Sequence, residues 1–284
     1  MGFVGVCFKS DKQISLLSLV NMKIEESENP DLTMKPFDNQ HQRSKSLHPD
    51  LLQPPFSLML VEPKGSGKSN SILRMIYGNK KKSTCKQTNT HYKFYRQYFD
   101  KIYVFSPTWQ LDPKMGRCRI PENQIFDEPD MYPQVIEQIL QGQEEDISEE
   151  GKSEADEILM IFSDLAGHRG VFSSSKGLMN KLAFNHRHFN LSIIIDTQSL
   201  RQINPAFRSN LSGIMLFAGI SNLLELQKIQ EEYLGRFSKK EAVQLLNYVF
   251  EKPYDFLFIN FQKPKNGRYF KKFNKLIIKG TELT

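Results

Sequence analysis

A short glycine-rich turn between an apolar run and a helical pattern constrains the fold of this chain more than any other feature. The apolar run is Phe56–Val61, and the helical pattern follows at Ser71–Ile76. The turn between them reads Glu62-Pro63-Lys64-Gly65-Ser66-Gly67-Lys68-Ser69. Strand, glycine-rich turn and helix, in this order, are the context that a phosphate-binding loop requires. The sequence therefore predicts a nucleoside triphosphate site at this turn.

The residue types in the loop match the chemistry of phosphate and magnesium binding. In a phosphate-binding loop, successive backbone N–H groups and the N-terminus of the following helix face the β-phosphate. We expect Lys68 to reach the β- and γ-phosphate oxygens and the hydroxyl of Ser69 to bind Mg²⁺. All eight residues from Glu62 to Ser69 are thus candidate nucleotide-binding residues, and ATP and Mg²⁺ are the predicted ligands.

The loop departs from the usual pattern G-x-x-x-x-G-K-[ST] at one position. Glu62 stands where the pattern has its first glycine, which supports the tight exit from the strand. A carboxylate at this place brings negative charge near a polyphosphate unless the side chain points away. The sequence therefore leaves open whether the site is fully active.

Length and composition fit one large α/β domain. The chain has 284 residues, of which 39% are hydrophobic, and a net charge of +6, a mild basic bias that fits a polyanionic partner. Residues 1–50 are weakly patterned and predict a poorly ordered N-terminal arm, which leaves 51–284 as an ATPase domain. No apolar run approaches the length of a membrane span, and no membrane partner is expected. The three cysteines (Cys7, Cys85 and Cys118) show no metal-binding spacing, so free thiols in a reducing compartment are expected.

From Pro54 onward, strand and helix patterns alternate, which predicts a mostly parallel sheet flanked by helices, as in the RecA-like P-loop NTPase fold. Several strands are nearly continuous apolar runs, as expected of strands covered on both faces. The expected strands are Phe56–Val61, Lys101–Ser106, Ile158–Phe162, Leu191–Asp196, Gly213–Phe217 and Phe256–Asn260. The expected helices are Ser69–Tyr77, Tyr132–Gln143, Ser175–His188, Leu223–Tyr233 and Lys239–Asn247.

Three charged segments interrupt this pattern. Residues 79–96 are basic with interleaved aromatic residues, and residues 144–157 are acidic. A solvated loop is the simplest interpretation of each, and we favour it for the acidic segment. The tail Lys263–Lys279 mixes basic and aromatic residues. This mixture suits contact with a nucleic-acid backbone together with base stacking. It suits an edge hairpin equally well, because lysine on an edge strand prevents aggregation.

An NTPase also needs a carboxylate at the tip of a neighbouring strand to hold the water shell of Mg²⁺. The best candidate follows Ile158–Phe162, where Ser163 and Asp164 stand in the places usually held by two acids. Neighbouring strand residues point to opposite faces, so Asp164 cannot fill both places unless the backbone turns. Either Ser163 reaches Mg²⁺ through water and Asp164 is the general base, or Asp164 takes the metal role. We favour the base assignment.

The next strand supplies further candidates. It ends in Thr197 and Gln198, and an amide at this place can sense the γ-phosphate and orient water. Two arginines follow. In ring ATPases such an arginine crosses to the γ-phosphate of the neighbouring subunit and stabilises charge in the transition state. Arg208 is the first choice for this role and Arg201 the second.

Together these motifs resemble the FtsK–HerA class of viral genome-packaging ATPases, in the branch of virophages, polinton-like elements and nucleocytoplasmic large DNA viruses that includes the poxvirus packaging ATPase. The resemblance extends from about residue 54 to 279. It depends on the loop, the Thr197–Gln198 strand end, the acidic strand, Ser106-Pro107-Thr108-Trp109 and Arg208-Ser209-Asn210. It implies a homo-oligomeric ring, a hexamer, that uses ATP to drive double-stranded DNA into a preformed capsid. It also implies contact with phosphates rather than bases, capsid or portal-vertex partners, and a place in the virion or the viral factory in the host cytoplasm.

Other classes of function remain open at this point. A helicase or a conjugation-type pump would use the same loop. Glu62 and Ser163 would suit a nucleotide-binding structural subunit that no longer hydrolyses ATP. A small-molecule kinase usually has an arginine-rich lid, and none is evident in the sequence.

Overall fold

The computed structural model describes residues 23–27, 47–63, 65–77, 83–84, 91–92, 94–113, 120–165, 178–220 and 222–279. For residues 23–27, 68, 83–84 and 91–92 it describes the backbone alone. Within these residues, ten strands form one sheet in the order β1-β12-β11-β10-β9-β2-β8-β7-β5-β6. The cysteines and the basic residues Lys80, Lys81, Lys82, Lys86 and Lys93 lie outside the described residues.

The middle of the sheet is parallel, and one side of it is antiparallel. Strand β2 (Ser57–Val61) pairs in parallel with β8 (Leu191–Thr197) and with β9 (Gly213–Phe217). The parallel pairing continues outward from β8 through β7 (Ile158–Phe162), β5 (Lys101–Phe105) and β6 (Ile125–Phe126). Beyond β9, antiparallel pairs join β10 (Phe256–Asn260), β11 (Tyr269–Lys271), β12 (Asn274–Lys279) and β1 (Lys23–Ser27). A separate short pair joins β3 (Ser83–Thr84) to β4 (His91–Tyr92).

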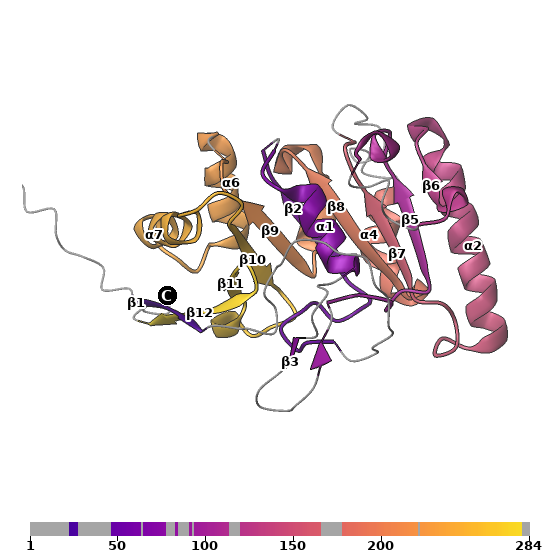
Figure 1. The fold of residues 1–284 in the computed structure, drawn as a ribbon, viewed down its shortest axis with the longest axis horizontal. Coiled ribbons are helices and arrows are strands. Elements are labelled where there is room, and N and C mark those ends of the chain that lie inside the picture. The colour runs from indigo at the N-terminus through magenta and orange to yellow at the C-terminus, as the bar shows by residue number, and fades with distance from the viewer. Residues whose placement is uncertain are drawn as a thin grey trace, which may run out of the picture.

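Helices cover both faces of this sheet, as Figure 1 shows. On one face, α1 (Lys68–Tyr77) packs through Ile72, Leu73 and Ile76 into one buried cluster. Four helices contribute to a second cluster on the other face: α2 (Tyr132–Glu150), α4 (Leu178–Asn185), α6 (Leu223–Tyr233) and α7 (Lys239–Val249). The short α5 (Pro205–Ser209) follows β8. The predicted α/β class with a mostly parallel central sheet flanked by helices is therefore confirmed.

Strand β8 shows why the middle of the central strands is apolar on both faces. Ile194 belongs to the cluster under α1, whereas Ile193 and Ile195 belong to the cluster on the opposite face. Since side chains alternate between faces along a strand, a sheet with helices on both sides favours apolar residues at consecutive positions.

Three segments differ from the prediction. Helix α2 continues to Glu150, so much of the acidic segment 144–157 is helix rather than loop, because glutamate is a good helix former even when exposed. Strand β1 adds residues 23–27 of the predicted arm to the sheet edge, where backbone pairing needs no apolar pattern. The basic segment 79–96 ends in the buried residues Phe94, Tyr95 and Arg96 rather than in a solvated loop.

The tail takes the hairpin form that the sequence left open. Strands β11 and β12 pair through Phe270 with Lys275 and through Lys271 with Asn274. Helix α7 begins with the capping box formed by Ser238 and Glu241. Among the described helices, none has both the length and the apolar character that crossing a membrane requires.

Candidate functional site

The predicted loop joins the carboxyl end of β2 to the first turn of α1. Gly65 has a φ of 86° and Gly67 a φ of 105°, a left-handed backbone that favours glycine. The backbone N–H of Ser66 donates to the carbonyl oxygen of Pro63 at 3.3 Å, and that of Ser71 donates to Gly67 at 3.0 Å. Lys68 opens the helix, but its side chain and all of Lys64 lie outside the described atoms. The loop thus has the turn and the helix N-terminus that bind phosphate.

The buried side chain of Glu62 stabilises the loop. Its backbone does not take a positive φ, so this position does not need glycine. Its side chain is buried, and its Oε2 accepts a hydrogen bond of 2.7 Å from the hydroxyl of Ser66. Its backbone N–H donates to the carbonyl oxygen of Thr197 at 3.1 Å, which ties the loop to β8. The carboxylate therefore stays within the loop and does not point away from it.

A cavity of about 780 Å³ opens over this loop. That volume lies within the usual range for small-molecule and cofactor sites. The loop, the tips of β5, β7 and β8, and the C-terminal hairpin all contribute to its wall. The lining residues are Glu62, Pro63, Gly65, Ser66, Gly67, Ser69, Asn70, Ser71, Thr108, Asp164, Gln198, Tyr254, Phe256 and Lys272.

The backbone turns at Asp164, directly after β7. Asp164 has a φ of 56°, which breaks the alternation of strand side chains. Its exposed side chain lines the cavity and accepts a 2.6 Å hydrogen bond from the hydroxyl of Thr108. Its backbone N–H donates to Oδ1 of Asp196 at 3.2 Å. Ser163 is buried and does not line the cavity, so the geometry favours Asp164 rather than Ser163 as the group that faces a bound phosphate.

The end of β8 brings Gln198 to the same cavity. The hydroxyl of Thr197 donates to Oε1 of Gln202 at 2.8 Å and so holds the turn that follows. The first turn of α6 holds this segment as well: Glu225 accepts hydrogen bonds from the backbone N–H of Leu200 and from the hydroxyl of Ser199. Gln198 is therefore presented by a turn that is fixed on both sides.

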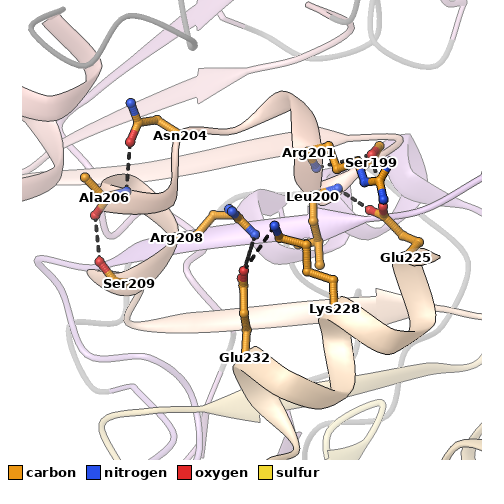
Figure 2. Close-up of polar contacts among 10 residues, drawn as sticks. All are labelled: Ser199, Leu200, Arg201, Asn204, Ala206, Arg208, Ser209, Glu225, Lys228 and Glu232. Carbon is orange, nitrogen blue, oxygen red and sulfur yellow. Dashed lines mark hydrogen bonds and ion pairs between the residues drawn. The ribbon is translucent and has the colours of Figure 1, made fainter.

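Arg208 takes part in a buried ion pair rather than facing solvent. Its Nη1 lies 2.6 Å from both carboxylate oxygens of Glu232 on α6, and its side chain is 3% exposed. Lys228, one turn earlier on α6, lies 3.7 Å from the same carboxylate. Figure 2 shows Arg208 directed at Glu232. Within one chain this geometry makes Arg208 a poor candidate for reaching a neighbouring subunit. The second choice, Arg201, is exposed.

Sequence reasoning missed residues that come from far along the chain. The ring of Tyr254, in the loop before β10, lies 3.2 Å from the position that a Cβ on Gly67 would occupy, so a larger residue at 67 would meet this ring. Lys272, in the turn between β11 and β12, lines the cavity too. A β-hairpin signal in the tail was visible, but nothing in the sequence links this tail to the loop. Asp196 was read only as part of a strand.

The residues on the cavity wall fit a magnesium–nucleotide complex. Ser69 and Asp164 both line the cavity and supply oxygen ligands. Among the described residues, no three His, Cys, Asp or Glu side chains gather as a closed metal site. Mg²⁺ is usually held by one or two protein oxygens together with substrate phosphates, which is what this wall offers.

Comparison with known proteins gives neighbours in structure but none in sequence. No family model matches the chain, and no curated protein matches it. One similar structure is B204, the DNA-packaging ATPase of Sulfolobus turreted icosahedral virus, with 14% identity, a TM-score of 0.47 and coverage of 74% of this chain and 94% of that one.

Two further structures have a similar likeness. The genome-packaging NTPase B204 of Sulfolobus turreted icosahedral virus 2, in complex with sulfate, has 15% identity and a TM-score of 0.49, with coverage of 80% of this chain and 96% of that one. The pCW3 conjugation coupling protein TcpA has 14% identity and a TM-score of 0.41, with coverage of 72% and 57%. Similarity at this level does not establish a function, which must follow from the residues of the site itself.

Proposed function

We propose that this chain is an ATP-hydrolysing motor that moves double-stranded viral DNA into a preformed capsid. The observation that supports the ATPase part is the meeting of three elements in one cavity: the phosphate loop, Asp164 and Gln198. The elements come from the carboxyl ends of neighbouring parallel strands, where ligands bind in α/β sheets.

Each group then has a role. The N–H groups of the loop and of the first turn of α1 bind the phosphates, and Lys68 neutralises their charge. Ser69 and Asp164 would hold Mg²⁺, which adds positive charge opposite the phosphates. Thr108 orients the Asp164 carboxylate. If Asp164 acts as the general base instead, the same hydrogen bond aims it at the attacking water. Gln198 orients that water, and Arg201 of a neighbouring subunit is the candidate that stabilises the transition state.

The motor part is supported by the resemblance in motifs and by the basic balance of the chain, with a net charge of +6. A packaging motor must accept any DNA sequence, so contacts go to phosphates. By the same resemblance we propose a homo-oligomeric ring, a hexamer, with capsid or portal-vertex proteins as partners and with a location in the virion or the viral factory. We also propose membership of the virophage and large DNA virus branch on this ground.

A steady-state ATPase assay with and without duplex DNA tests the proposal. Wild-type protein is expected to hydrolyse ATP faster with DNA, and the stimulation is expected to fall as salt rises, because counterion release weakens phosphate contacts. Lys68→Ala and Asp164→Asn should each lower turnover by about 10³-fold or more, by removal of transition-state charge stabilisation, with an unchanged unfolding midpoint. Normal turnover in Lys68→Ala would show that the site is assigned wrongly.

One observation favours a second candidate, a nucleotide-binding subunit with weakened hydrolysis. The Glu62 carboxylate remains inside the phosphate loop, bound to Ser66. Such a subunit would bind ATP with Mg²⁺ but show no turnover with or without DNA, so the same assay combined with a binding measurement separates the two candidates.

A further inference from the structure

The turn between β11 and β12 is fixed beside the phosphate loop. Lys272 has a φ of 57°, and its backbone N–H donates to the carbonyl oxygen of Phe256 on β10 at 2.8 Å. The next residue, Phe273, is buried, with its ring centroid 5.6 Å from that of Phe256. The backbone at Lys272 therefore has a defined place at the edge of the cavity, while its long side chain can still move.

The ammonium group of Lys272 is bound at present by a buried carboxylate. Its Nζ lies 2.7 Å from Oδ1 of Asp255, whose side chain is 1% exposed, while the Lys272 side chain is 42% exposed. Lys272 also lines the cavity that contains the loop, Asp164 and Gln198. A half-exposed lysine on a flexible stem can reach a second anion in that cavity.

Asp255 does not depend on Lys272 alone. Its Oδ2 lies 3.7 Å from Nζ of Lys271 and accepts a hydrogen bond of 3.2 Å from the backbone N–H of Lys252. Removing the sole partner of a buried charge is strongly unfavourable. The ammonium group of Lys271 and the backbone N–H of Lys252 remain beside Asp255. Lys272 can therefore leave Asp255 without depriving the buried carboxylate of every partner.

We propose that Lys272 is a second cation of the nucleotide site, which leaves Asp255 and binds the terminal phosphate of a nucleoside triphosphate. The inference deepens the proposed function and rests on the cavity being a nucleotide site. The cavity wall already carries Glu62 and Asp164, so a polyanion that enters it needs added positive charge. The terminal phosphate is the expected target because Lys272 shares the cavity with Asp164 and Gln198, the residues assigned to that phosphate.

This exchange would make the C-terminal hairpin sensitive to the nucleotide. Strand β12 pairs on one side with β11 and on the other with β1. Lys272 would contact the triphosphate but not the diphosphate. The turn that joins β11 to β12 would therefore be bound to the nucleotide before hydrolysis and to Asp255 after it. Because Lys272 lies more than two hundred residues after the loop in the chain, only folding brings the two together.

The chain offers a matched control for the test. Lys271 and Lys272 are adjacent and both lie near Asp255, but only Lys272 lines the cavity. We would compare full-length Lys272→Met, Lys272→Arg and Lys271→Met with the wild type. Equilibrium binding of a fluorescent non-hydrolysable ATP analogue and of fluorescent ADP would be measured in Mg²⁺, with urea unfolding midpoints to verify the fold.

Lys272→Met should weaken binding of the ATP analogue about tenfold, the size of one charge-assisted hydrogen bond, and change ADP binding less than about twofold. Lys272→Arg should restore most of the affinity, and Lys271→Met should change neither ligand. An unchanged affinity for the ATP analogue in Lys272→Met, or an equal loss for both ligands, would overturn the inference while leaving the nucleotide site intact. A wild-type protein that binds neither ligand would overturn the proposed function as well.

Discussion

Two ion pairs in this structure use similar groups in different ways. Arg208 and Glu232 join α5 to α6 through one guanidinium nitrogen, Nη1, that donates to both carboxylate oxygens, and the arginine side chain is 3% exposed. Lys272 and Asp255 join the C-terminal turn to the start of β10, and here the cation is 42% exposed and the anion is buried. In the first pair the cation is enclosed, whereas in the second it faces a cavity.

The difference shows which charged groups are free to act on a ligand. If Arg208 moved away, it would lose two charge-assisted hydrogen bonds from Nη1, and Glu232 would keep Lys228 at 3.7 Å. Lys272 makes one contact, and its partner keeps a second lysine. The contrast assigns Arg208 a structural role and leaves Lys272 as the cation that can turn toward a ligand. Three predictions test this comparison.

The largest effect is expected for Arg201→Ala. If Arg208 is committed to Glu232, the arginine that crosses to a neighbouring subunit is Arg201, and its loss should lower DNA-stimulated turnover by about 10³-fold. The unfolding free energy should stay within about 0.5 kcal/mol of wild type, as is usual for an exposed side chain. Steady-state ATPase measurements on the assembled protein check this, and full activity in Arg201→Ala would reject the assignment.

Arg208→Ala should affect stability first. Removing one partner of a buried ion pair costs several kcal/mol; since Glu232 is 30% exposed and keeps Lys228, we expect a loss of about 2–3 kcal/mol. Urea unfolding measures it. The double variant Arg208→Met with Glu232→Met should recover most of the loss. A stable Arg208→Ala protein without turnover would contradict the structural role of Arg208. It would support the role predicted from the sequence, contact with the γ-phosphate of a neighbouring subunit.

The smallest effect is expected for Lys272→Met on stability. Because Lys271 remains beside Asp255, the unfolding free energy should fall by no more than about 1 kcal/mol, as for a partly exposed ion pair. The double variant Lys271→Met with Lys272→Met leaves Asp255 without either lysine and should cost clearly more than the sum of the two single changes. Additive single effects in the same urea experiment would mean that the two lysines do not share Asp255.

Local patterns in the sequence were sufficient for much of the framework. The apolar runs at β7, β9 and β10 gave the observed bounds, because strands buried on both faces must be apolar throughout. The Gly65 and Gly67 turn before α1 was equally readable, because the left-handed backbone found there favours glycine. An exposed helix was harder to predict from the sequence, because the acidic end of α2 has no apolar face that would give a helical periodicity.

The sequence patterns predicted which residues end the strands. They therefore predicted which side chains lie at the same edge of the sheet. Whether each of them faces the cavity depended on tertiary structure. The turn at Asp164 is set by its contacts with Thr108 and Asp196, and the burial of Arg208 is set by α6, two elements further along the chain. The C-terminal hairpin meets the phosphate loop only because β10 pairs with β9 beside β2. Such contacts between distant segments leave no local periodicity, so only the folded chain could reveal Lys272.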